Sequence, residues 1–419
     1  MRAMKNSGVD WLGALPKDWA ASRIGSLFSE RKQQVSSNTY TPLSVTKSGV
    51  VPQLDSAAKS DSTETRKMVR TGDFVINSRS DRKGSSGLSP YDGSCSSIYI
   101  VLSPKGLEGE FAHRLLRSGA FQEEFYRWGT GIVDDLWSTR YSNMKMIRIP
   151  VPPIQEQRDI ISYLKQETSQ IDLLISKKEQ LIEKLLERRQ ALITHFVTKG
   201  LGPLRQLGAG ADWSGAVPLD WKVEKASRLF RARKGSQAAK LSVEYCASHA
   251  GDFPVYSGQT ENQGIMAHVD SFEFDFEERS VLLTTTVGSS KVMSVRRISG
   301  KFSLSQNCMI LEYTRDSELH SDYAYWMITA AFDYKKLQLE AHMQNSFRMS
   351  DFYSYKLLVP PLDEQIQIAR HLDNEAQQID TLVKKTKKAI DLLKERRQAL
   401  ITQVVTGKID VRGFTGGNS

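Results

Sequence analysis

The stretch from Val151 to Thr198 is present twice in this chain, and it constrains the fold more than any other sequence feature. The second copy runs from Val359 to Thr406, 208 residues further on, and it aligns with the first without a gap. Both copies open with Val-Pro-Pro-x-x-Glu-Gln and end near Glu-Arg-Arg-Gln-Ala-Leu-Ile-Thr, and roughly half of the positions are identical. A match of this length at one fixed offset indicates an internal duplication.

Each copy has the pattern of one long helix. Two prolines stand at its start, where the missing N–H of proline costs no helical hydrogen bond. No further proline or glycine occurs before Gly200 in the first copy and Gly407 in the second, and a helix of about 40 residues is roughly 60 Å long. Apolar residues recur in steps that are sums of three and four, so they form one stripe. The stripe comprises Ile160, Leu164, Ile171, Leu174, Ile175, Ile182, Leu185, Leu192 and Ile193 in the first copy, and Ile368, Leu372, Ile379, Leu382, Val383, Ile390, Leu393, Leu400 and Ile401 in the second.

Both stripes are narrow and flanked by charged residues. This favours burial of the two stripes against each other as an antiparallel coiled coil. The alternative is that the two long helices belong to the cores of separate domains.

The opening of the chain is duplicated as well. Residues 10–19 and 212–221 share the pattern Asp-Trp-x-Gly-Ala-x-Pro-x-Asp-Trp at an offset of 202, and we expect Trp19 and Trp221 to be core residues. The chain is therefore two half-repeats, each a globular module followed by a long helix. The predicted segments are a first module at 1–149, a long helix at 150–199, a linker at 200–212, a second module at 213–357, a second long helix at 358–407 and a tail at 408–419.

Each module is expected to be mixed α/β, which gives an α/β (α+β) fold with an internal two-fold repeat. Short apolar runs bounded by turn residues predict strands at 73–77, 97–102, 280–285 and 308–311, and helical patterns lie near 111–128 and 322–339. Between these landmarks the two modules diverge almost completely. A scaffold that is present twice but carries two different surfaces is suited to a protein that recognises two different half-sites.

The first module has a basic loop directly after its strand at 73–77. Residues 66–83 hold six basic side chains against two acidic ones. Arginine and asparagine can read guanine and adenine edges with paired hydrogen bonds, and small residues let the backbone approach a phosphate. The candidate DNA contacts are therefore Asn77, Ser78, Arg79, Arg82 and Lys83, with a solvated surface loop as the alternative.

The second module offers corresponding candidates. Thr285, Ser289 and Lys291 follow a predicted strand, and Tyr256 and Gln259 lie in a polar segment with a ring that can stack on a base. A basic run would contact phosphates rather than bases; it contains Arg231, Arg233 and Lys234. Arg140 and Arg348 occupy matching Ser-x-Arg-x-Ser segments before the two helices, so we interpret both as shared scaffold or phosphate contacts.

Composition and missing motifs limit the function classes. The net charge of +9 fits a polyanionic partner such as nucleic acid. Three scattered cysteines favour neither a disulfide framework nor a zinc site. We find no phosphate-binding Gly-x₄-Gly-Lys loop, no methyltransferase motif and no metal or triad spacing, so no catalytic or metal residue is assigned. No long apolar run is present, and we expect a cytoplasmic protein with no membrane partner.

With these motifs together, the chain resembles the specificity subunit of a type I restriction–modification enzyme over nearly its full length. The resemblance rests on the duplicated opening, the two Pro-Pro-x-x-Glu-Gln starts, the paired helix ends and the closing residues 406–411. It implies that each module is a target-recognition domain for one half of a split double-stranded DNA target, and that the coiled coil sets the spacing. It also implies two modification subunits that carry S-adenosylmethionine, motor-nuclease subunits that use ATP and magnesium, and no cofactor or catalysis in this chain.

Three other interpretations stay open on sequence alone. The chain could serve a related system in which methylation and cleavage share one partner polypeptide. It could be a coiled-coil scaffold that binds only proteins, which would have no affinity for DNA. It could also be a nuclease, although no set of carboxylates is marked by its spacing.

Overall fold

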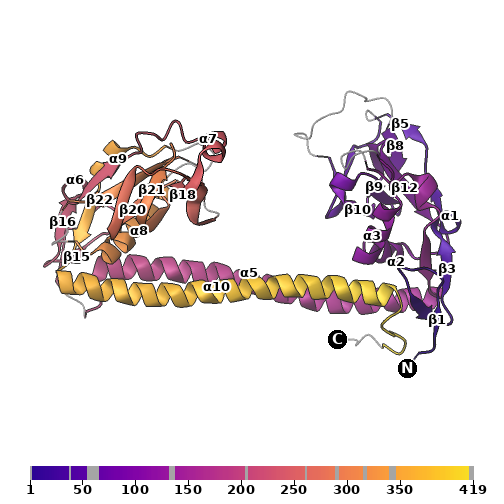
Figure 1. Ribbon diagram of the computed structural model, residues 1–419. Coiled ribbons are helices and arrows are strands. Elements are labelled where there is room, and N and C mark those ends of the chain that lie inside the picture. Colours follow the sequence, from indigo (N-terminus) through magenta and orange to yellow (C-terminus); the bar gives the residue numbers. More distant parts are fainter. Residues whose placement is uncertain are drawn as a thin grey trace. The chain divides into compact units, whose positions relative to one another are not determined.

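A computed structural model of the chain describes residues 2–36, 39–53, 66–131, 137–202, 206–259, 262–287, 292–314, 319–338 and 346–414. The chain divides into two compact units: residues 1–179 with 387–419, and residues 180–386. Each unit therefore holds one module, the first part of the long helix that follows that module and the last part of the other long helix (Figure 1). Among the described residues, no helix is both long and apolar enough to span a membrane.

The module of the first unit is built from small sheets and short helices. The strand orders of its separate sheets are β10-β9-β12-β4, β11-β8-β5, β13-β3, β6-β7 and β1-β2. The strands are β1 Met4–Asn6, β2 Ala14–Pro16, β3 Ala20–Arg23, β4 Phe28–Glu30, β5 Gln34–Val35, β6 Leu43–Thr46, β7 Gly49–Pro52, β8 Arg66–Val69, β9 Phe74–Asn77, β10 Ser86–Leu88, β11 Gly93–Ser96, β12 Tyr99–Pro104 and β13 Arg148–Val151. The helices are α1 Ile24–Leu27, the 3₁₀ turn η1 Ser80–Arg82, α2 Gly109–Leu116, α3 Gly119–Arg127 and α4 Tyr141–Met144.

The module of the second unit has one larger sheet, ordered β17-β22-β20-β21-β18-β19, beside the pairs β16-β23 and β14-β15. Within this sheet β18 and β21 run parallel, and the other pairs are antiparallel. The strands are β14 Leu207–Gly208, β15 Val217–Pro218, β16 Lys222–Lys225, β17 Phe230–Arg233, β18 Ala250–Tyr256, β19 Ile265–Val269, β20 Phe274–Thr285, β21 Val295–Leu304, β22 Cys308–Tyr313 and β23 Lys356–Val359. The helices are α6 Ala226–Leu229, α7 Val243–Ser248, the 3₁₀ turn η3 Asn262–Gly264, α8 Ser321–Lys336 and α9 Met349–Tyr353.

The duplicated ends of the two modules form the same frame. In the first unit β3 pairs with β13, so the strand after Trp19 lies beside the strand that leads into the long helix. In the second unit β16 pairs with β23 in the same way after Trp221. Trp19 and Trp221 are both buried, as predicted. Each divergent interior is thus inserted between two strands of a shared closing pair.

The two long helices are α5 Ile154–Lys199 and α10 Leu362–Val405. Each begins directly after its two prolines and ends at a glycine in the left-handed region, Gly200 at φ 73° and Gly407 at φ 72°. Glycine reaches this conformation without the steric cost that other residues incur, so it stops a helix cleanly. The helices begin four residues after the predicted bounds 150 and 358, because those positions still belong to β13 and β23; α5 ends at the predicted Lys199, and α10 ends two residues before the predicted bound 407.

The helices pack against each other in antiparallel fashion inside each unit. In the first unit Ile160 and Leu164, near the start of α5, share a core with Ile401 and Val404 near the end of α10. In the second unit the converse holds, because Ile193 and Val197 pack with Ile368 and Leu372. Each helix therefore runs through both units, and the alternative of two helices confined to separate domain cores is wrong.

Leu174 and Leu382 do not belong to the buried seam, contrary to the predicted stripe. They are 48% and 49% exposed, respectively. The seam repeats in heptads and includes Ile171 and Ile175 in α5 and Ile379 and Val383 in α10. Leu174 and Leu382 directly precede Ile175 and Val383, so they lie outside the seam and face solvent. Of the other stripe residues, Leu164, Ile171, Leu372, Ile379 and Ile390 are buried, while Ile182, Leu185, Leu192, Leu393 and Leu400 are half-buried.

The helical pattern predicted near 111–128 is two helices, α2 and α3, rather than one. Ser118 separates them, because its hydroxyl accepts from the backbone N–H of Phe121 and donates to the carbonyl of Leu115 at 2.7 Å. Serine at this position caps a new helix instead of continuing the old one. The second pattern, near 322–339, corresponds to the single helix α8.

Parts of the predicted linker and tail are folded onto the modules. Strand β14 pairs with β15, while residues 203–205 of the linker lie outside the described residues. In the tail, the Nζ of Lys408 donates to the carbonyl of Leu12 at 2.8 Å, and Val411 is buried in the core of the first unit. Residues 415–419 lie outside the described residues.

Candidate nucleic-acid interface

The Glu-Gln pair of the duplicated helix start joins each helix to its module. The indole N–H of Trp19 donates to Glu156 at 2.9 Å, and that of Trp221 donates to Glu364 at 3.1 Å. The amide of Gln157 donates to the carbonyl of Pro152 at 3.0 Å and accepts from the backbone N–H of Glu108 at 2.8 Å. Gln365 makes the corresponding bonds, at 2.8 Å each, with Pro360 and with the N–H of His320. The motif therefore fixes where each module sits on its helix.

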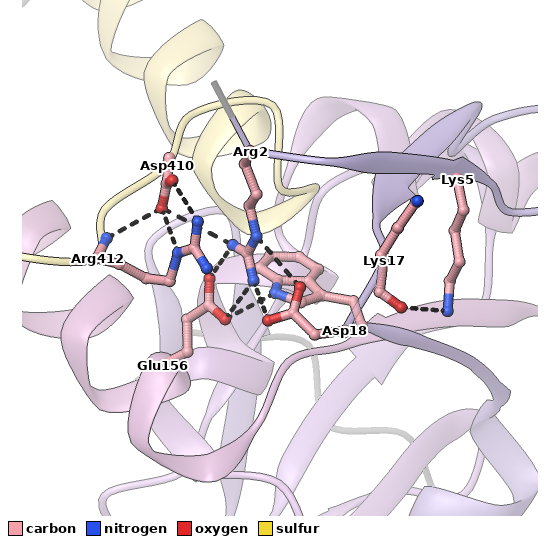
Figure 2. A network of polar contacts seen from close by, with 8 residues as sticks. Arg2, Lys5, Lys17, Asp18, Glu156, Asp410 and Arg412 are labelled. Atoms are coloured by element: carbon pink, nitrogen blue, oxygen red, sulfur yellow. Dashed lines mark hydrogen bonds and ion pairs between the residues drawn. The ribbon is translucent and has the colours of Figure 1, made fainter.

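In the first unit this junction also contacts the first described residues of the chain and the tail that follows α10 (Figure 2). Arg2 points between Asp18 and Glu156, donating to Glu156 at 2.8 Å and to Asp18 at 3.2 Å. Asp410 of the tail lies 3.9 Å from Arg2. The hydrogen bond with Glu156 raises the pKa of Arg2 and outweighs the opposing effect of burial. Arg2 and Glu156 are buried, so this network forms part of the scaffold that positions the first module on α5.

The candidate loop of the first module is held against the Ser-x-Arg segment. The backbone N–H of Thr139 donates to the carbonyl of Ser78 at 3.0 Å, and Arg79 forms a β-bridge with Ser138. Arg79 is exposed, and Arg140, two residues after the bridge, is exposed as well. The two basic groups that the sequence marked separately thus lie on adjoining backbone segments.

The second module repeats this arrangement. The N–H of Phe347 donates to the carbonyl of Thr286 at 2.7 Å, and Val287 forms a β-bridge with Ser346. Arg348 lies two residues after the bridged Ser346, is exposed and is at the N-terminal end of α9. Ser138 and Ser346 are 208 residues apart, so both units present the same Ser-x-Arg segment beside the loop after the corresponding strand.

Three of the candidate DNA-contact residues are hydrogen-bonded within their own module. Asn77 is only 4% exposed, and its side-chain oxygen accepts from the N–H of Arg79 at 3.1 Å, so it shapes the loop. Thr285 is 1% exposed, and its hydroxyl accepts from the N–H of Ser294 at 3.1 Å. The hydroxyl of Ser78 donates to the carbonyl of Ile98 at 2.9 Å. Asn77 and Thr285 are the last residues of β9 and β20, at the predicted strand ends, and their side chains are buried there.

Arg79 and Arg82 have exposed side chains, while Lys83 forms an ion pair with Glu123 at 2.5 Å. In the second unit Arg231, Arg233 and Lys234 are exposed, and Arg233 lies 3.4 Å from Glu312 with its guanidinium 5.0 Å from the ring centre of Phe274. Ser289 and Lys291 lie outside the described residues.

Tyr256 and Gln259 are only partly available to a ligand. Tyr256 packs edge-on against Phe302 with ring centres 5.6 Å apart, and burial raises its pKa. The side-chain amide of Gln259 donates to the carbonyl of Ile265. Arg296 was not predicted as a site residue, yet it donates to the backbone carbonyl of Gln259 at 2.8 Å. It lies on a distant strand, so sequence spacing gave no signal for it.

Within the described ranges, no three His, Cys, Asp or Glu residues are grouped in a way that could hold a metal ion. Cys95, Cys246 and Cys308 are buried and form no disulfide. Burial raises the pKa of both Cys95 and Cys308 to about 12, which keeps these thiols protonated and unreactive.

Comparison with known proteins agrees with this arrangement of two framed modules. The family described as "Type I restriction modification DNA specificity domain" matches residues 16–184 and 218–392. The chain therefore belongs to the type I restriction–modification specificity family, as the resemblance predicted.

Individual relatives are distant. The chain is 23% identical to the EcoDI specificity subunit of Escherichia coli over 47% of this chain, and the aligned part spans 40% of that relative's length. It is 22% identical to the MjaVIII specificity subunit of Methanocaldococcus jannaschii over 96% of this chain and 95% of the relative. A solved structure from work on the assembly and conformational transition of the type I R-M system covers 94% of this chain and 99% of its own, with a TM-score of 0.69 and 16% identity. This likeness bears out the fold of two mixed α/β modules with a long helix pair.

Proposed function

We propose that this chain recognises double-stranded DNA for a type I restriction–modification complex, with each module reading one half of an asymmetric bipartite target. The observation that carries this proposal is the duplicated frame with two unlike interiors. The β3–β13 and β16–β23 pairs repeat, while the sheets between them differ in order and size. A repeated frame would hold each module in the same position on its helix, while the differing interiors would allow each module to recognise a different half-site.

The base readers in this proposal are the exposed residues of the first module's loop. Arg79 and Arg82 have guanidinium groups that can pair with the O6 and N7 of guanine. Arg140 and Arg348, at the shared Ser-x-Arg segments, would contact phosphates and place each module on the duplex. Lys234 and the two arginines of β17 would add phosphate contacts in the second unit.

The long helices are proposed to dock the modification subunits and to set the spacing between half-sites. Each unit leaves leucines of the helix pair exposed: Leu173, Leu174 and Leu392 in the first, and Leu181, Leu186 and Leu382 in the second. In this proposal the modification subunits supply S-adenosylmethionine, and motor-nuclease subunits supply ATP- and magnesium-dependent cleavage. The chain itself contributes recognition and no catalytic residue.

The test measures binding of the chain, with its modification subunits, to its target duplex. Arg79→Ala and Arg82→Ala should each weaken binding by about 1–3 kcal/mol if they read bases. Lys17→Ala is the control, because Lys17 is an exposed cation outside the candidate loop. Unchanged affinity and an unchanged methylation pattern in both arginine variants would contradict the assignment of the readers, and absence of any DNA affinity in the unaltered complex would contradict the proposed function.

A further inference from the structure

A basic pocket in the first unit lies beside the candidate loop. It encloses about 480 Å³, between the β6–β7 turn, the turn after η1, helix α2 and the last part of α10. Five cationic side chains line it: Lys47, Lys83, Arg114, Arg117 and Arg397. Lys83 belongs to both this pocket and the candidate loop, so the two surfaces are continuous.

Only two of these five cations have a carboxylate partner within the described chain. Lys83 pairs with Glu123, and Arg397 pairs with Asp172 at 2.9 Å. No such ion pair holds Lys47, Arg114 or Arg117 in the part of the chain that the structure describes, although the guanidinium of Arg117 donates to the backbone carbonyl of Lys47. The Nε of Arg114 is shielded from solvent and has no hydrogen-bond partner there. A buried guanidinium nitrogen without an acceptor is costly unless a ligand supplies one.

The electrostatics of the neighbouring groups agree with an excess of positive charge in the pocket. Burial lowers the pKa of Arg114 and of Arg117, and the charge of Arg397 lowers both further, while the charge of Glu110 partly opposes this at Arg114. Burial, reinforced by these two arginines, lowers the pKa of His113 to about 4. His113 is therefore neutral at pH 7, while the arginines remain charged because guanidinium pKa values lie far above neutrality.

The second unit provides an internal comparison. Arg189 is the repeat counterpart of Arg397, and its partner Asp380 is the counterpart of Asp172; the pair is 3.2 Å apart. The pocket at Arg189 also contains Arg297, which binds Asp322 at 2.5 Å and Asp373 at 2.8 Å. Arg189 itself lies 5.5 Å from the ring centre of Trp326. The framework arginine is common to both units, but the pocket of the second unit supplies its own carboxylates.

We propose that the pocket formed by Lys47, Arg114 and Arg117 binds a backbone phosphate of the DNA, beside the half-site read by the first module. This inference rests on the proposed function. Guanidinium groups bind phosphate oxygens with paired, charge-assisted hydrogen bonds, and a small recess admits one phosphate better than an extended acidic peptide. The shared position of Lys83 makes a DNA strand that contacts the loop the nearest source of such a phosphate. The first unit then holds its half-site with a contact that the second unit lacks.

The experiment compares target binding by the assembled complex across a salt series. Each phosphate contact contributes about 0.9 to the slope of log affinity against log salt. The Arg114→Gln/Arg117→Gln double variant should therefore bind about tenfold more weakly, with a slope shallower by about one, and no change in the base sequence preferred. Lys47→Gln should act in the same direction; Lys47 is exposed on a turn, so this variant keeps the test valid if the double variant does not fold. The Lys17→Gln/Lys105→Gln double variant removes two exposed charges of the same unit outside the pocket, and its slope should not change.

Ethylation of single phosphates identifies the contacted group. Ethylation at one position beside the first half-site should weaken binding by the unaltered complex and have no added effect on the double variant. An unaltered slope in both the double variant and Lys47→Gln, with the unaltered complex binding its target, would overturn this inference and leave the proposed function standing. Loss of modification-subunit assembly with an unchanged DNA slope would identify an acidic protein surface as the ligand and would also overturn it. A complex with no DNA affinity at all would instead refute the proposed function.

Discussion

At the scale of single residues, buried polar groups in this chain connect segments that are far apart in sequence. Glu156 accepts hydrogen bonds from Trp19 and from Arg2, and Gln157 bonds to Pro152 and Glu108. Because each of these groups has its partner, burial costs little, whereas removal of one partner would leave a charge or an amide unpaired. The Pro-Pro-x-x-Glu-Gln sequence is thus explained by hydrogen bonding at the module–helix junction.

His113 gives the chain a predictable pH dependence. Its Nδ1 accepts from the N–H of Leu88 at 3.1 Å, and its pKa is lowered to about 4 from a usual 6.5. The unfolded chain therefore binds a proton between pH 6.5 and 4 that the folded chain does not, so the free energy of unfolding falls as the pH drops through this window. We expect a loss of about 2–3 kcal/mol between pH 7 and pH 4 from this one group.

The measurement is urea unfolding of the chain at several pH values, with His113→Asn as the comparison. Asparagine can place an acceptor near the position of Nδ1 but does not titrate in this range. The stability difference between the two proteins should therefore shrink, or reverse, as the pH falls from 7 to 4. A difference that stays constant over this range would show that His113 is not held in its neutral form.

The candidate site shows which residue-level features a sequence can reveal. The basic loop could be predicted because Arg79 and Arg82 follow a short apolar run and stay exposed. The burial of Asn77 and Thr285 could not, because it depends on the partners that the last side chain of each strand meets, such as the N–H of Arg79 and the N–H of Ser294. Arg114 and Arg117 were missed for a related reason: they read as ordinary surface residues of an amphipathic helix until the β6–β7 turn and α10 pack beside them.

At the scale of elements, the long helices were predicted well because their signals are local. Prolines, terminal glycines and an apolar period are all read along one segment. Whether Leu174 or Ile175 belongs to the seam could not be read from this segment alone, because it depends on how the partner helix packs against α5. The break between α2 and α3 needed the capping role of Ser118, which a helical pattern alone does not show.

The seam assignment predicts opposite outcomes for two leucines of α5. Leu164→Ala removes a fully buried side chain and should destabilise the first unit by about 2–5 kcal/mol. Leu174→Ala changes an exposed side chain on the same helix and should alter stability by less than about 0.5 kcal/mol. Denaturant unfolding of the chain without partner proteins measures both, and equal effects would contradict the assigned heptad phase.

If the helix pair sets the half-site spacing, a matched lengthening should change the target. Seven residues added after Leu181 in α5, together with seven after Lys387 in α10, add one heptad to each helix and keep the seam in phase. One heptad is about 10 Å of helix, or roughly three base pairs of DNA. The spacer of the methylated motif should lengthen accordingly. An assembled complex that still methylates the original spacing would refute this role of the helices.

At the scale of the whole molecule, the chain is one frame used twice with two interiors. The frame was predictable because it repeats at fixed offsets, and the repeats include Trp19 and Trp221 with their partners Glu156 and Glu364. The interiors were not predictable beyond their α/β class. Strand orders such as β17-β22-β20-β21-β18-β19 depend on long-range pairing, for which a single sequence carries no local signal.

The measurement that tests the central claim most directly is modified-base sequencing of DNA from cells that express this chain with its modification subunits. It is compared with DNA from cells that lack the chain, and from cells in which residues 20–145 are replaced by the module of another family member. We predict a new methylated motif in two unlike halves around a fixed gap, and replacement of the module should change one half only. An assembled complex that adds no motif, or a module exchange that alters both halves, would contradict the account.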